Sequence, residues 1–161
     1  MYAEAFNQPL NKWKTSNVTD MRQTFCNAKS FNQSLDTWNT SKVTNMEKMF
    51  SGATDFNGKL ETWNTSKVTN MSSMFSDATA FNQPIKCDVK NQRWNTELVT
   101  DMSNMFDGAK NFNQDISSWV IQQDTNTLNM FLNASAMSNE NYCKCVEAWN
   151  RSDLGKDETC N

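Results

Sequence analysis

The amino-acid sequence predicts an α/β solenoid in which each repeat unit contributes one short parallel β-strand and one short helix. Two observations lead to this prediction. A closely similar segment returns through most of the 161 residues, and within each copy a β-branched run precedes apolar residues at helical spacing. Because one copy is too short to bury its own apolar face, we expect neighbouring copies to stack on one another.

The repeat unit begins at a Phe-Asn pair, and the first three intervals between these pairs are 25 residues. The fourth interval is 31 residues, because the segment 86–93 holds a six-residue insertion. The sequence therefore predicts a five-unit solenoid over 1–136 and a cysteine-containing C-terminal cap over 137–161. The units start at Phe6, Phe31, Phe56, Phe81 and Phe112.

The first predicted element of each unit is a strand, represented by residues 65–69, Thr-Ser-Lys-Val-Thr. This run is rich in β-branched residues and contains no Gly or Pro. If Val68 faces the core, strand alternation turns Thr65, Lys67 and Thr69 outward. Stacked units would then form a parallel sheet with one exposed face.

The second predicted element is a helix of about two turns that follows the strand. In the unit 56–80, the apolar residues follow an i, i+3, i+4, i+7 pattern, and Asn70 stands at the expected N-cap. The apolar positions are Met71, Met74, Phe75 and Ala78.

The outward positions of the predicted sheet are the candidate binding face. They are mostly polar yet repeat from unit to unit, and stacked-repeat proteins often bind partners through such extended surfaces. The candidate residues are Thr15, Asn17, Thr19, Thr40, Lys42, Thr44, Thr65, Lys67, Thr69, Thr96, Leu98 and Thr100.

Aromatic residues also recur in every unit, and such residues can stack on sugars or bases. Because the Phe and Trp positions have the same period as the other core positions, we expect them to pack in the interior. The Asn that follows each Phe is expected to form a ladder, in which each side chain satisfies backbone groups of the adjacent unit.

Three of the five cysteines lie in the predicted cap. Cys160 could reach back to either Cys143 or Cys145, and a disulfide there would suit an extracellular chain. Reduced thiols in a cytosolic protein are the competing interpretation. Cys26 and Cys87 lie three units apart, which places them too far from each other for a bridge.

Composition argues against several functional classes. The net charge of -3 gives no nucleic-acid footprint, and no apolar run is long enough for membrane insertion. The sequence has no His and no phosphate-binding Gly motif, so we expect no enzyme activity and no cofactor. Paired CxxC spacings are absent, so no metal site is predicted either.

The quoted motifs closely resemble the BspA-like class of leucine-rich repeats, whose units read approximately FNQxLxxWxxSxVTxMxxMFxxAxx. Matching segments are FNQSLDTWNTSKVTNMEKMFSGATD and, in the tail, MSNENYCKCVEAW. The resemblance covers about residues 6–150 and departs from the pattern at the insertion KCDVKN and at the tail cysteines. It implies a leucine-rich-repeat-like solenoid that is secreted or displayed on the cell surface and used for adhesion and protein binding.

Three functions remain open from the sequence. The first is adhesion to a protein or glycan on a cell or host surface through the candidate face. The second is a structural spacer or shell component, with possible end-to-end self-association through an uncapped edge. The third is ice binding by the Thr positions. The opening residues MYAEAF resemble the end of a preceding unit, so we expect a segment of a longer protein whose export signal lies elsewhere.

Overall fold

The computed structural model describes residues 3–156 and 160, and in this part of the chain the predicted α/β solenoid is wrong. The regular elements there are the 3-10 helix η1, Val89–Asn91, and the α-helix α1, Asn139–Trp149. Neighbouring units pair through isolated β-bridges and form no sheet among the described residues. A leucine-rich-repeat solenoid, with a strand and a helix in each unit, therefore does not describe this fold.

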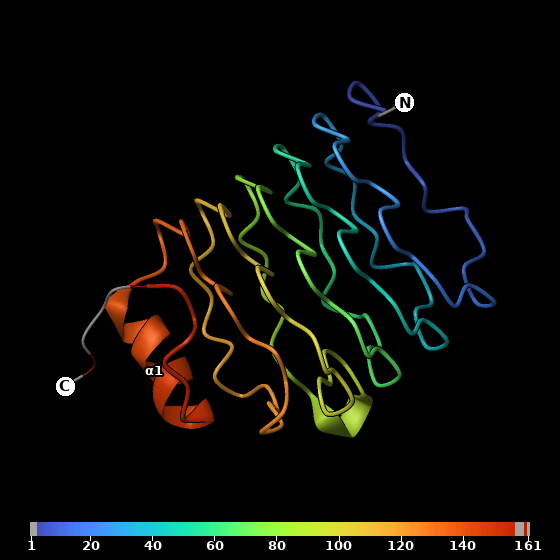
Figure 1. Ribbon diagram of the computed structural model, residues 1–161. Helices are drawn as coiled ribbons and strands as arrows, with labels where there is room; N and C mark the ends of the chain where they lie inside the picture. Colours follow the sequence, from blue (N-terminus) through green and yellow to red (C-terminus); the bar gives the residue numbers. More distant parts are fainter. Residues whose placement is uncertain (1–2, 157–159, 161) are drawn as a thin grey trace.

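The chain instead passes through irregular wide turns that lie side by side, from the N-terminal end to α1 (Figure 1). Backbone hydrogen bonds join each turn to the next. The N–H of Met46 donates to the carbonyl of Asn70 at 2.9 Å, and the N–H of Met71 donates to the carbonyl of Asp101 at 2.8 Å. Contacts between equivalent residues of successive units therefore hold the molecule together in place of regular elements.

The predicted helix does not form because two residues in each unit have a left-handed backbone. Ser73 has φ 52 and Asp77 has φ 56, whereas an α-helix needs φ near -63°. The N–H of Ser73 donates to Ser103 of the next unit at 2.9 Å, and the N–H of Met74 donates to Met71 at 3.2 Å within the same unit. Alternate N–H groups thus point between units, and no helical series of i to i-4 bonds arises.

The predicted strand fails for a different reason, which is a tight turn within each Thr-Ser-Lys-Val segment. The N–H of Val68 donates to the carbonyl of Thr65 at 2.9 Å, and the same bond closes between Val43 and Thr40 at 2.9 Å. A turn of this kind breaks strand alternation, so both Thr65 and Val68 point inward.

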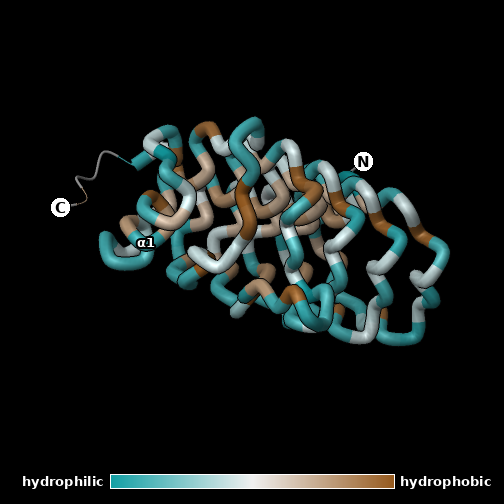
Figure 2. The backbone as a smooth tube through the Cα atoms, turned by 90° about the horizontal axis from the view of Figure 1, so that it is seen from below, coloured by the Kyte–Doolittle hydropathy of each residue, from teal (hydrophilic) through white to brown (hydrophobic). Residues whose placement is uncertain are grey.

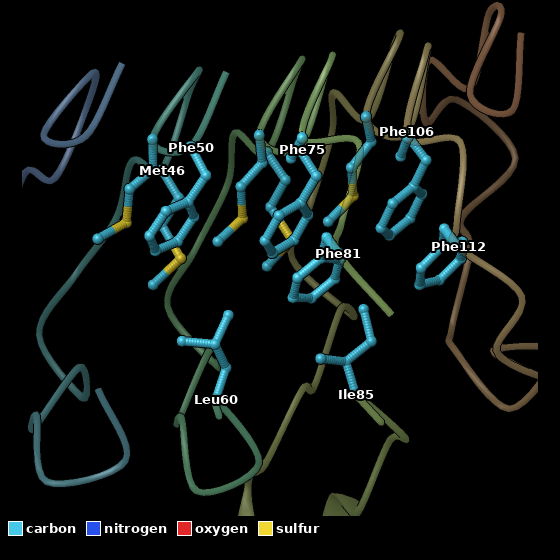
Figure 3. Packing of buried hydrophobic residues seen from close by; sticks show 14 of the residues in the cluster. Met46, Phe50, Leu60, Phe75, Phe81, Ile85, Phe106 and Phe112 are labelled. Carbon is cyan, nitrogen blue, oxygen red and sulfur yellow. The ribbon is translucent and has the colours of Figure 1, made fainter. Parts of the chain in front are cut away.

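The core consists of aromatic rows that run along the stack, as the sequence predicts. The ring of Phe75 lies 5.5 Å from Phe50 and 5.6 Å from Phe106, and Figure 3 shows these rings entering the interior from successive units. Trp63 is also fully buried, and its Nε1 donates to the carbonyl of Leu35 at 3.0 Å. Short apolar segments therefore recur along an otherwise polar chain (Figure 2).

The predicted Asn ladder is confirmed. The Oδ1 of Asn57 accepts the N–H of Asn82 at 2.9 Å, and the Oδ1 of Asn32 accepts the N–H of Asn57 at 2.8 Å. Each Asn side chain therefore satisfies a backbone donor of the next unit, which fixes the spacing between turns.

The C-terminal end is closed by α1, which starts where another unit would begin. The N–H of Ser138 donates to Asn113 Oδ1 at 3.0 Å, as the Asn of a further unit would. Ser138 also caps α1 by accepting the N–H of Asn141. The helix then buries Tyr142, Cys145 and Trp149 against the last unit, so this end has no open apolar surface of the kind that an unfinished stack leaves.

A disulfide between Cys143 and Cys160 ties the segment after α1 back to the helix. Among the described residues, Cys26, Cys87 and Cys145 are free thiols. Of the two partners that the sequence left open for Cys160, the structure thus uses the one on the more exposed side of α1.

Candidate functional site

Eight of the twelve candidate residues form an exposed band across four units, which we call the Thr stripe. The band holds one Thr from each unit and a second, variable residue two positions before it. The members are Asn17, Thr19, Lys42, Thr44, Lys67, Thr69, Leu98 and Thr100, all of them exposed.

The other four candidates are buried, and the prediction that they face outward is wrong. They are Thr15, Thr40, Thr65 and Thr96, which are between 0% and 6% exposed. The tight turn described above rotates them inward. Their hydroxyls bond to the next unit, as when Thr65 Oγ1 donates to the carbonyl of Asn95 at 2.7 Å.

The Thr residues of the stripe are held rigidly by paired hydrogen bonds. The N–H of Thr44 donates to the carbonyl of Thr19 at 2.8 Å, and its Oγ1 donates to the same carbonyl at 3.1 Å. Thr69 repeats both bonds to Thr44, at 2.9 and 3.2 Å. Because each hydroxyl hydrogen is used inside the fold, the free lone pairs of the oxygen are left for groups outside it.

The variable residues give the stripe a direction. At one end Lys42 Nζ donates to Asn17 Oδ1 at 2.8 Å. The next ammonium, on Lys67, has no hydrogen bond or ion pair with any residue that the structure describes. Leu98 follows with 55% of its surface exposed. The stripe therefore offers two cations, a row of hydroxyl acceptors and one apolar side chain to a partner.

Nucleophilic chemistry finds no support in the cysteines. Burial raises the pKa of the Cys145 thiol to about 12, so at neutral pH this group stays protonated and unreactive. Within the described residues, no cluster of three or more His, Cys, Asp or Glu side chains is placed to hold a metal ion.

The sequence gave no role to the insertion around η1, which the structure folds into a projecting loop. The N–H of Asp88 donates to the carbonyl of Arg93 at 2.9 Å, and the N–H of Arg93 donates back at 3.0 Å. The loop leaves Val89 51% exposed. Its only signal in the sequence is the break in the repeat period.

A family model described as "Mycoplasma protein of unknown function, DUF285" matches residues 1–92 and again residues 89–157. No curated protein and no solved structure matches the chain. In the part of the chain that the structure describes, no helix is both long and apolar enough to span a bilayer.

Proposed function

The chain belongs to the DUF285 family of Mycoplasma proteins, and from this premise we propose that it is a non-enzymatic surface protein that binds a protein or glycan partner through the Thr stripe. The family is associated with the mycoplasma surface. The resemblance to BspA-like adhesins stays a prediction, and it points to the same function. Secretion or surface display is further supported by the disulfide between Cys143 and Cys160, because such bonds persist in oxidising surroundings.

The observation that carries this proposal is the exposure of one regular polar band on an otherwise irregular molecule. Stripe hydroxyls donate inward, at 3.1 Å from Thr44 and 3.2 Å from Thr69, so their orientation is set before a partner arrives. Preorganised groups lose little freedom on binding, which favours affinity. The ammonium of Lys67 adds a donor that nothing in the described fold engages.

The chemistry of the stripe fits a partner rich in hydrogen-bond acceptors and negative charge. Ammonium groups bind carboxylate, sulfate or carbonyl oxygens, while Thr oxygens accept from hydroxyl or amide donors. Both an acidic protein surface and a glycan chain offer this combination along an extended line.

The test is adhesion of protein-coated beads to cultured host cells. We expect Lys42→Glu/Lys67→Glu to reduce bead binding about tenfold, which corresponds to 1.4 kcal/mol. The matched control, Lys12→Glu/Lys59→Glu, makes the same charge change at exposed positions outside the stripe and should bind as the wild type does. Equal binding by both variants, with unfolding temperatures unchanged, would exclude the stripe as the site and favour the spacer role.

The ice-binding alternative gains nothing from the fold, because one of the two Thr columns on which it rests is buried. A freezing-hysteresis measurement on the same preparation addresses it directly, and we expect no hysteresis above that of a control protein.

A further inference from the structure

The N-terminal end of the stack is an open face, unlike the C-terminal end. Trp13 is 59% exposed, whereas its counterpart Trp38 in the next unit is 4% exposed. The ring of Trp13 stacks on Trp38 at 6.1 Å, and no described aromatic ring covers its other side. A recess of about 410 Å³ opens beside it. The lining includes Phe6, Leu10, Trp13, Phe25 and Ala28.

The backbone of this face is incomplete as well. In the second unit, four carbonyls accept N–H groups from the first unit at 3.0, 3.0, 2.8 and 2.7 Å. These acceptors are Asn45, Glu47, Met49 and Ser51. Their counterparts in the first unit accept no backbone N–H from the residues that the structure describes. The counterparts are Asp20, Arg22, Thr24 and Cys26.

A third group on the same face lacks its usual partner. In the second unit, Trp38 Nε1 donates to the carbonyl of Leu10 in the unit before it, at 3.2 Å. Trp13 has no such acceptor within the described residues. The open face therefore asks for N–H donors on alternate residues, a carbonyl for an indole, and aromatic rings in two rows.

These three requirements are met together by the opposite edge of a unit of the same pattern. That edge presents alternate N–H groups, as Met21, Gln23, Phe25 and Asn27 do toward the second unit. Docking there would continue the interface that already joins every pair of units in the chain.

A second copy of this chain is a poor source of that edge. Its last unit has spent its donors on the tail, since Asn129 N–H bonds to Asp153 at 2.9 Å and Phe131 N–H to Leu154 at 2.7 Å. Trp149 Nε1 closes the end by donating to Trp119 at 3.1 Å. Two N-terminal faces brought together would set unpaired carbonyls against unpaired carbonyls, which is unfavourable.

We propose that the N-terminal face docks a partner polypeptide that carries the same repeat unit and leaves the donor edge of its last unit uncovered. Recognition is by edge pairing and aromatic stacking, so it depends on the repeat pattern of the partner rather than on its charge. This surface is separate from the Thr stripe, and it gives the protein a second, assembly function.

The experiment tethers a copy of the unit 56–80 ahead of the full chain through a flexible Gly/Ser linker, which supplies a millimolar effective concentration. Hydroxyl-radical footprinting read by mass spectrometry then measures Trp13 alone. We expect its oxidation to fall severalfold, to the level of Trp38, and the unfolding temperature to rise. The control tether carries Trp63→Ser and Phe75→Ser in the added copy and should leave Trp13 as reactive as in the untethered chain.

Two results would overturn the proposal. The first is equal oxidation of Trp13 with the intact and the control tether. The second is self-association of the untethered chain in sedimentation that Trp13→Glu abolishes, because this outcome would assign the face to a second copy. Neither result bears on bead adhesion through the stripe, so the two proposals can fail independently.

Discussion

Single aromatic residues carry much of the stability, because each one contacts its own unit and both neighbours. Phe75 lies 3.9 Å from Phe81 in ring-centroid distance, in addition to its contacts with Phe50 and Phe106. A residue in such a position has no room to relax around a cavity.

We predict that Phe75→Ala lowers the free energy of unfolding by roughly 3 to 5 kcal/mol, through lost burial and the cavity that remains. Urea unfolding followed by Trp fluorescence measures the change. Leu98→Ala serves as the matched control, since Leu98 is 55% exposed and its loss should change stability by less than about 0.5 kcal/mol. Similar values for the two variants would contradict the assignment of the Phe row to the core.

The Asn ladder makes a second prediction at this scale. Asn57→Ala removes the acceptor of the Asn82 N–H and of Gln83 Nε2, at 2.9 and 3.1 Å, and should destabilise by about 1 to 3 kcal/mol. Asn57→Asp keeps the accepting oxygen and should lose much less. If the two substitutions proved equally harmful, the hydrogen bond would not be the cause.

At the scale of elements, α1 and the tail act as one lid over the last unit. Ser138 starts the helix, and the tail returns across the unit to the disulfide at Cys160. Tyr142 Oη donates to the carbonyl of Lys156 at 3.1 Å, and Lys156 Nζ donates to the carbonyl of Met137 at 2.6 Å. Covalent and polar contacts thus replace the neighbouring unit that other turns possess.

Loss of the disulfide should loosen this lid. The bridged cysteines are 17 residues apart, and closing a loop of this length stabilises by about 3 kcal/mol in the chain-entropy model. We therefore expect Cys143→Ser/Cys160→Ser to lower the free energy of unfolding by about that amount, and to expose Trp149 first. Cys26→Ser/Cys87→Ser, which alters two free thiols, is the control and should change stability little.

Thiol reactivity tests the packing of α1 from another side. Burial raises the pKa of Cys145 to about 12 and also raises the pKa of Cys26 and Cys87 from 9.0. Because the thiolate is the reactive form, alkylation at pH 8 should be slow at Cys26 and Cys87 and slower still at Cys145. Iodoacetamide labelling read by mass spectrometry checks this order. Early labelling of Cys145 in the folded protein would show that α1 does not seal the end.

At the scale of the whole molecule, equivalent contacts repeat from one unit to the next. Stability should therefore behave approximately as a sum over units and their interfaces. Carbonyl and ring partners of the second and third units can substitute for each other, because Phe31 and Phe56 have equal burial and stack in the same row.

Deleting one complete unit should consequently be tolerated. Removal of residues 31–55 takes out 25 residues and keeps every column in register, so we expect a folded protein with a lower unfolding temperature. Removal of residues 31–50 breaks the register and should abolish cooperative unfolding. Near-ultraviolet circular dichroism and thermal melts distinguish the two. A cooperative melt in the shorter deletion would mean that register is not what holds the stack.

The sequence by itself determined the period, the unit boundaries and the interior columns. Trp38, Trp63, Trp94 and Trp119 are all buried, as their shared period predicts, because residues that face the same surroundings in every unit are repeated in every unit. Trp13 departs from this only because the described residues place no unit over it.

Tertiary structure alone decided the backbone between these columns. The spacing of Met71, Met74, Phe75 and Ala78 is helical, but the N–H groups around them bond to the next unit, and left-handed residues at Ser73 and Asp77 are favourable only when that unit is present. The same holds for the tight turn that buries Thr65 and leaves Thr69 in the stripe. Apolar spacing records which side chains are interior, whereas hydrogen bonds between units choose the path that takes them there.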